Sequence, residues 1–95
     1  MTTTTARVPT ASASRYLQQL CKHWSHKFEV SFDAEAGQIM LPFGTTDLRA
    51  SVDALDIIVT LNDGADPARA QQVIADHLNR FAFREGELEF DWQMG

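Results

Sequence analysis

The apolar residues between positions 13 and 26 recur at the spacing of an amphipathic helix. At about 100° per residue, one stripe of such a helix collects Ala13, Tyr16, Leu17, Leu20 and Trp24. The opposite side collects Arg15, Gln19, Lys22 and His26, with His23 on the border between the two. A serine just before the stripe, Ser12 or Ser14, can cap the first free amides. The pattern therefore predicts a helix over 13–26 that packs one face against a core.

Four segments after this helix alternate apolar and polar residues with period two, which is typical of strands with one buried face. The segments span about 27–33, 38–43, 48–52 and 55–61. Their inward sets are Phe28, Val30 and Phe32, then Ile39, Leu41 and Phe43, then Leu48, Ala50 and Val52, and finally Leu55, Ile57, Val59 and Leu61. Because the connections between them are short, we expect antiparallel hairpins with one apolar face and one solvated face.

A second helix and a last strand complete the pattern. Asp66 and Pro67 are typical of a helix start, as the N-cap and the first helical residue, and this helix should run to about Ala82. Its buried stripe consists of Ala70, Val73, Ile74, His77, Leu78 and Phe81. After Gly86, a final strand is predicted from the apolar positions Leu88, Phe90 and Trp92, which alternate with Glu87, Glu89 and Asp91.

We therefore predict a single α+β domain over 13–95, with an antiparallel four- to five-stranded sheet and two helices on one face. The order is helix, four strands, helix, strand. It suggests the TATA-binding-protein-like topology that phosphohexomutase C-terminal domains also use, an analogy of fold that carries no function. A ferredoxin-like arrangement needs a helix between the first two strands, and 34–37 is too short for one. Residues 1–12 are expected to form a flexible N-terminal arm, in which Val8 alone suggests a short edge strand.

Composition and charge restrict the function classes. The 95 residues carry a net charge of −5, yet 1–27 holds four basic residues and no acid. The remainder holds four basic and all thirteen acidic residues, which amounts to −9, and this sign argues against nucleic-acid binding. No apolar run approaches the ~20 residues of a membrane span, and no signal peptide is evident. The single Cys21 excludes an internal disulfide, so we expect a cytoplasmic protein without membrane contact.

Two long stretches resemble the bacterial domain of unknown function 2218. Residues 14–28, SRYLQQLCKHWSHKF, are similar to the opening signature of that family, and 76–85, DHLNRFAFRE, to its closing signature. Leu88 through Trp92 fits the family's terminal strand. The resemblance implies a bacterial stand-alone protein or small appended domain. It also implies an association with siderophore-interacting flavoproteins and iron-uptake systems, without assigning a reaction to any residue.

His23, His26 and His77 are the candidate metal ligands. Histidines three apart share a helical face and can both reach one cation. A regular helix places Cys21 about 140° from His26, which disfavours a joint chelate with the thiol. The alternative is that His23 and His26 only mark a helix C-terminus, where positive charge suits the dipole. His77 would then be a core residue whose ring nitrogen bonds a carbonyl or hydroxyl oxygen.

Three further side chains are other candidate site residues: Cys21, Arg80 and Arg84. Cys21 is expected to be an inert, half-buried thiol rather than a nucleophile, because no neighbouring base is evident. Arg80 and Arg84, close to Glu85, suggest a structural ion pair, with anion recognition as the alternative. Catalytic motifs such as a glycine-rich phosphate loop or a serine-hydrolase signature are absent from the sequence.

The leading functional hypothesis is a non-catalytic accessory or interaction domain without a certain cofactor. Its partner would be an unknown protein or a second copy in a weak homodimer, and not nucleic acid. Met40 and Ile58, apolar at otherwise solvated strand positions, would contribute if the strands set them side by side. The alternative is a small metal-handling (iron) protein that uses His23, His26 and His77. An enzyme of unrecognised mechanism comes third.

Overall fold

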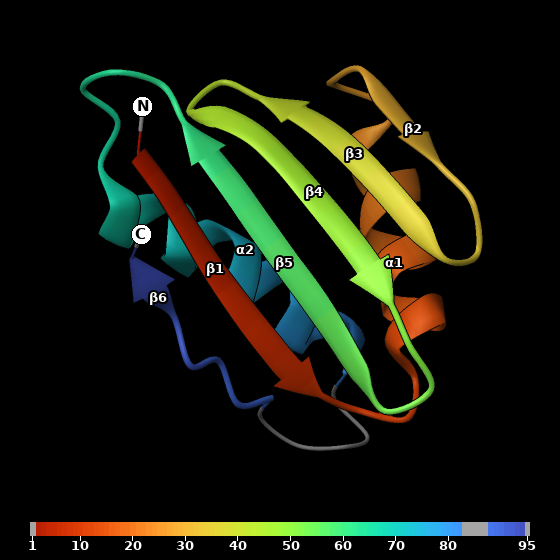
Figure 1. Cartoon of the computed structure of the whole chain (residues 1–95). Coiled ribbons are helices and arrows are strands. Elements are labelled where there is room, and N and C mark those ends of the chain that lie inside the picture. The colour runs from red at the N-terminus through yellow and green to blue at the C-terminus, as the bar shows by residue number, and fades with distance from the viewer. Residues whose placement is uncertain (1, 83–87, 95) are drawn as a thin grey trace.

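Six antiparallel strands form one open sheet in the computed structural model, which describes residues 2–82 and 88–94 (Figure 1). The spatial order of the sheet is β2-β3-β4-β5-β1-β6. The strands are β1 (Thr2–Pro9), β2 (Val30–Phe32), β3 (Ala36–Leu41), β4 (Gly44–Ala50), β5 (Ala54–Leu61) and β6 (Gln93–Met94). The helices are α1 (Ala13–Trp24) and α2 (Pro67–Phe81).

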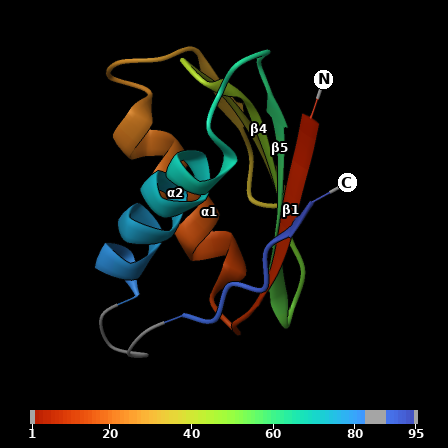
Figure 2. The same cartoon turned by 90° about the vertical axis from the view of Figure 1, so that its left-hand side faces the viewer.

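Both helices lie on the same face of this sheet, and no helix covers the opposite face within the described residues (Figures 1 and 2). The core fills the space between the two layers. The sheet contributes Val8, Ile39, Leu48, Leu55, Ile57, Val59 and Leu61, and the helices contribute Tyr16, Leu17, Leu20, Ile74 and Leu78, all fully buried. The α+β class and the placement of the helices are confirmed, whereas the sheet has six strands instead of four to five.

The prediction of a flexible N-terminal arm is wrong, because most of that segment is a long inner strand. β1 pairs antiparallel with β5 over its whole length, from Thr2 opposite Leu61 to Pro9 opposite Ala54, and its other edge holds β6. Thr4, Ala6 and Val8 face the core. The alternation was hidden in the sequence because a threonine and an alanine stand at two of these three inward positions. The chain order is therefore strand, helix, four strands, helix, strand.

Helix α1 ends at Trp24, two residues earlier than the spacing predicted. The carbonyl of Trp24 accepts hydrogen bonds from the amides of Lys27 and Phe28, at 3.0 and 2.9 Å, and this closes a tight turn. At the other end, Ser12 is the N-cap by position, but its side chain makes no capping hydrogen bond. The amide of Ser12 instead donates to the hydroxyl of Thr10, at 3.1 Å.

Helix α2 begins as the sequence predicted. The carboxylate of Asp66 accepts a hydrogen bond from the amide of Ala68, at 3.0 Å, and Pro67 starts the helix. After the helix a C-terminal strand is present, but it is Gln93–Met94, and the stretch 88–92 that was predicted to form it is not in a strand. Leu88 is nevertheless buried, and its amide donates to the side chain of Asn79 at 2.9 Å.

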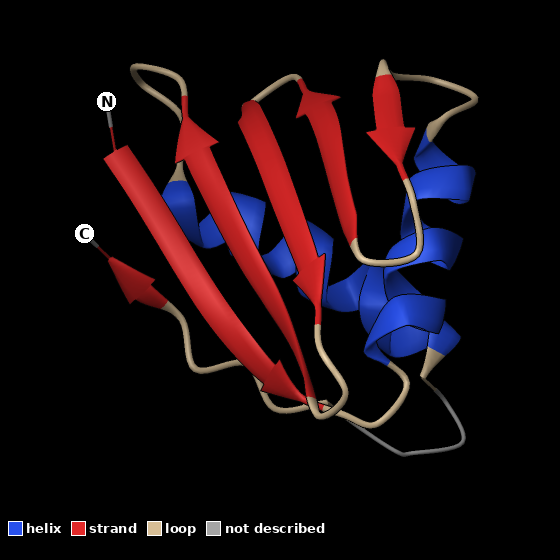
Figure 3. Cartoon of the chain, turned by 45° about the vertical axis from the view of Figure 1, so that its right-hand side comes forward, coloured by secondary structure: helices blue, strands red, loops and turns tan. Residues whose placement is uncertain are grey.

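Two of the hairpin predictions were also too long. The strand expected over 27–33 is paired only at Val30–Phe32, at the sheet edge that Figure 3 shows beside α1. Val52 was expected to point inward at the end of a strand, but it lies in the β4–β5 turn and is 91% exposed.

Neither helix of the described residues is long and apolar enough to cross a membrane.

Candidate functional site

The end of α1 and the C-terminal part of α2 bring four rings together. The ring of His77 lies against those of Trp24 and His23, with centroids 4.8 and 5.3 Å apart, and His23 meets Phe81 at 6.2 Å. His77 Nδ1 is 2.7 Å from the carbonyl oxygen of Val73, one helical turn earlier. The Nδ1–H therefore donates to this carbonyl, and Nε2 is the nitrogen left for another partner.

The three predicted metal ligands do not assemble into one site. His23 and His77 come together, but His26 lies beyond the last residue of α1 and so no longer shares a helical face with His23. No group of three His, Cys, Asp or Glu side chains in 2–82 and 88–94 is placed to hold a metal ion. The remaining pair supplies two of the four ligands that a tetrahedral zinc site needs.

The pKa of His23 lies below the ordinary value of histidine. Desolvation of the imidazole is the largest cause, and the nearby charges of His77, Arg80, Lys27 and His26 lower the pKa further. All of these neighbours are basic, so a proton on His23 meets only like charge. The electrostatics at this helix end therefore favour the neutral imidazole.

We expect this lowered pKa to appear as a pH dependence of stability. The pKa of His23 is lower in the folded chain than in the unfolded one, so the contribution of neutral His23 to the free energy of unfolding is complete above about pH 6.5. This stabilising contribution is lost as the pH falls through the lowered pKa of the folded chain. The free energy of unfolding, measured by urea titration between pH 7 and 5, should fall less in a His23→Gln variant than in the wild type. An equal fall in both proteins would contradict the prediction.

Cys21 is fully buried, more deeply than the sequence suggested. Burial raises the pKa of its thiol to about 11, so the thiol is protonated at neutral pH, and only the thiolate is a good nucleophile. The sulfur packs where α1 crosses the sheet, and a Cβ atom built on Gly37 would stand 2.8 Å from it. This geometry supports the interpretation of Cys21 as an inert packing residue.

The two candidate arginines contribute little to a site within the described chain. Arg80 is exposed in the last turn of α2 and acts on His23 through its charge. Arg84 and Glu85 lie outside the described residues, and so does the ion pair predicted for them.

The open face of the sheet carries a groove of about 700 Å³. Strands β1, β4 and β5 form its floor, and the segment that leads into β6 forms one wall. Its outward side chains are Thr5, Arg7, Pro9, Arg49, Asp56, Ile58, Glu89, Asp91 and Gln93. The groove is thus mostly polar, mixed in charge, and apolar at Ile58 and Pro9.

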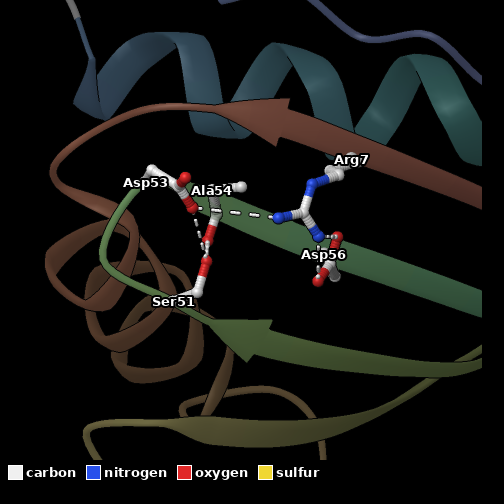
Figure 4. A network of polar contacts seen from close by, with 5 residues as sticks. All are labelled: Arg7, Ser51, Asp53, Ala54 and Asp56. Carbon is white, nitrogen blue, oxygen red and sulfur yellow. Dashed lines mark hydrogen bonds and ion pairs between the residues drawn. The ribbon is translucent and has the colours of Figure 1, made fainter.

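One end of this groove is organised by Arg7 (Figure 4). Its Nη1 donates to both carboxylate oxygens of Asp56, at 3.0 Å each, and Nη2 lies 3.8 Å from Asp53. The hydroxyl of Ser51 donates to the same Asp53 carboxylate, at 3.2 Å, and to the carbonyl of Ala54. Exposed ion pairs contribute about 0–1 kcal/mol to stability, so this network mainly orients the charges on the face.

The two exposed apolar residues of this face are near one another but not adjacent. Ile58 is 37% exposed and stands between Asp47 of β4 and Thr5 of β1. Met40, 44% exposed, is paired with Thr45 of β4, whose hydroxyl lies 3.7 Å from its sulfur. Strand β4 separates the two side chains, so the side-by-side arrangement considered from sequence does not occur.

A smaller hollow of about 380 Å³ opens beside Trp24 and His77. The sequence did not single out two residues of its lining, Arg69 and Phe43. A signal for Arg69 was present, because Arg69, Val73 and His77 follow one another at intervals of four and share a stripe of α2. Phe43 had no such signal, since it was expected within a strand and lies in the β3–β4 turn instead.

The protein is thus a small α+β domain whose sheet leaves one face open and whose surface carries hollows. Within residues 2–82 and 88–94 it has no assembled metal cluster. The chain belongs to the family described as "Uncharacterized protein conserved in bacteria" (DUF2218), whose profile matches residues 5–93. The resemblance inferred from the opening and closing motifs is therefore confirmed.

A solved structure supports the same fold. The chain is similar to PA4090 from Pseudomonas aeruginosa, determined by NMR, with 42% sequence identity and a TM-score of 0.79. The match covers 98% of this chain and 96% of the Pseudomonas chain. Among curated proteins no relative was found.

Proposed function

We propose that this protein is a non-catalytic interaction domain that holds a protein partner against the open face of its sheet. The observation that carries the proposal is the exposure of Ile58 among polar strand residues on a face that neither described helix covers. Single exposed apolar residues are common. Ile58 is distinguished from such residues by the groove around it.

The surroundings of Ile58 have the composition of a protein interface. Protein interfaces combine an apolar centre with a polar rim. Here the centre is Ile58, and the same row of the sheet holds Thr5, Asp47 and Gln38, the last two joined by a hydrogen bond of 3.1 Å. Paired strands hold these side chains in place, so little conformational freedom would be lost on binding.

The charges on this face indicate the kind of partner. Asp47, Asp56, Glu89 and Asp91 outnumber the two outward arginines, and Arg7 is already engaged by Asp56. A partner with a basic or neutral polar surface is therefore favoured, while the phosphates of nucleic acid would be repelled. A cytoplasmic location is part of this proposal, supported by the single Cys21, which has no second cysteine in the sequence with which to form a disulfide. An association with siderophore or iron-uptake systems is also part of it, supported by the family resemblance.

The proposal is tested by introducing a charge at the centre of the face. Tagged wild type, Ile58→Glu and Val52→Glu are used to capture proteins from a lysate of a bacterium that carries the family. Val52 is the matched control, because it is apolar and 91% exposed but lies in the β4–β5 turn. We expect a protein captured by the wild type and by Val52→Glu to be lost with Ile58→Glu. Capture that does not respond to Ile58→Glu would refute the proposal.

Self-association through the same face is checked by sedimentation velocity over a range of concentrations. If the partner is a second copy, the sedimentation coefficient of the wild type rises with concentration and that of Ile58→Glu does not. A metal-handling role remains the alternative, supported by the approach of His23 to His77. Stoichiometric metal in protein purified without a His-tag, lost in a His77→Gln variant, would favour that alternative.

A further inference from the structure

The hollow beside Trp24 lies where α1 and α2 meet the β3–β4 turn, away from the open face of the sheet. Its apolar lining is formed by Trp24, Phe28, Leu41, Pro42, Phe43 and Val73. Trp24 and Leu41 are almost fully buried, at 5% and 7% exposed, so they form the floor, and the half-buried rings of Phe28 and Phe43 stand at the sides. The volume of about 380 Å³ lies at the lower end of the range for small-molecule sites.

The walls of this hollow are firmly held. The ring of Phe28 packs edge-on against Trp24, with centroids 6.4 Å apart, and its amide donates to the Trp24 carbonyl. The turn that carries Phe43 is tied to the end of β5 by Asn62, whose amide donates to the Phe43 carbonyl and whose side chain donates to the Pro42 carbonyl. The hollow is thus preformed, which lowers the entropic cost of binding.

The polar side chains of the lining are all basic. Lys27, Arg69 and His77 border the hollow, and no acidic residue among those described lines it. This contrasts with the whole chain, in which thirteen acidic residues outnumber eight lysines and arginines. Neither Lys27 nor Arg69 forms an ion pair with a described residue, although Arg69 also borders a neighbouring hollow with Asp63 and Asp66. Their charges are therefore available to an anion.

We propose that this hollow binds a small carboxylate with a flat aromatic body. The aromatic body would stack between Trp24 and the two phenylalanines, as rings do in offset or edge-on contacts. The carboxylate would lie at the rim between Lys27 and Arg69, both of which can donate charge-assisted hydrogen bonds to it. His77 Nε2 offers an acceptor for an N–H group of the aromatic body, because the Nδ1–H donates to the Val73 carbonyl. This site is independent of the partner surface around Ile58.

The experiment is an NMR titration of the ¹⁵N-labelled chain with indole-3-acetate and with its neutral amide. The expected Kd for the acid is on the order of 1 mM, as for a weak fragment of this size, with shifts at the Trp24 indole N–H and the amides of Phe28 and Phe43. The amide should bind at least about fivefold more weakly, because the charge-assisted bonds are missing.

Variants show whether the two cations act as proposed. Lys27→Gln and Arg69→Gln should each weaken binding of the acid about three- to tenfold and leave the amide unchanged. Lys22→Gln is the matched control, since it removes an exposed lysine of α1 that does not line the hollow, and should have no effect. Ile58→Glu should also have none. All these residues are exposed, so the fold is retained. The proposal would be overturned by equal affinity for the acid and the amide, or by shifts confined to the open face. It would also be overturned if no shift appeared at ligand concentrations well above the expected Kd.

Discussion

Replacement of Gly44 by alanine should destabilise the protein by about 3–5 kcal/mol, the sum of steric and backbone costs. Gly44 is the first residue of β4 and has a φ of 154°, which side chains rarely adopt. A Cβ atom there would stand 2.1 Å from the carbonyl oxygen of Thr60 and 2.9 Å from the Cα of Leu61. Both atoms belong to the backbone of β5, so they can move only if the pairing of β4 and β5 is disturbed.

Thermal unfolding followed by circular dichroism measures this loss. The Gly44→Ala midpoint should fall by more than roughly 10 °C in a chain of this length. Gly64→Ala is the control for backbone strain alone, because Gly64 has a φ of 82° and a Cβ there would meet no atom within 4 Å. If the midpoint of Gly44→Ala falls no further than that of Gly64→Ala, the chain relieves the contact with Thr60 at little cost and the prediction is wrong.

Two buried threonines should respond with opposite signs to the same substitution. Thr46→Val is expected to stabilise the fold by about 1–2 kcal/mol, because it removes a desolvated hydroxyl and keeps the shape. Thr46 is fully buried between Ile39 and Val59. Its hydroxyl makes no hydrogen bond with any residue in the described ranges. Valine suits the strand position as well as threonine does.

Thr4→Val is expected to destabilise the fold by about 1–3 kcal/mol, because it leaves former partners unpaired. Thr4 is as buried as Thr46, but its hydroxyl donates to the carbonyl of Gln93 and accepts from the side-chain amide of Gln71, both at 2.9 Å. These bonds fasten β6 and α2 to β1.

Urea unfolding of both variants measures the two free energies, and amide exchange at Gln93 and Met94 reports on β6. We expect faster exchange at these two residues in Thr4→Val only. If both valine variants lower the stability to the same extent, the difference between a paired and an unpaired buried hydroxyl does not decide their effects.

The periodic parts of the chain could be predicted from the sequence because their signals are local. The apolar stripe of α1 and the alternation around Ile57 and Val59 each bury one face, and each is visible without knowledge of the rest of the fold. The start of α2 was equally clear, since the Asp66 cap and Pro67 act on their immediate neighbours. The family also followed from local motifs.

The candidate sites could be predicted only in part, since they depend on where helices end and cross. The approach of His23 to His77 agrees with the predicted placement of both helices on one face of the sheet. The loss of His26 from that group depends on the hydrogen bonds that end α1 at Trp24, which the spacing did not show. The hollow beside Trp24 is lined by residues of α1, α2 and the β3–β4 turn. Since these residues are far apart in the sequence, no single segment predicts the hollow.

The helices, most strands, the acidic charge and the family of this protein depend on residue type and on contacts within a few positions, and they are therefore visible in the amino-acid order alone. The position of the Thr-rich start as an inner strand depends on the assembled fold. Thr4 can occupy a buried position there because Gln93 and Gln71, distant in sequence, satisfy its hydroxyl. A polar residue on a buried face is acceptable only where such partners are supplied, and partners of this kind are set by the assembled fold.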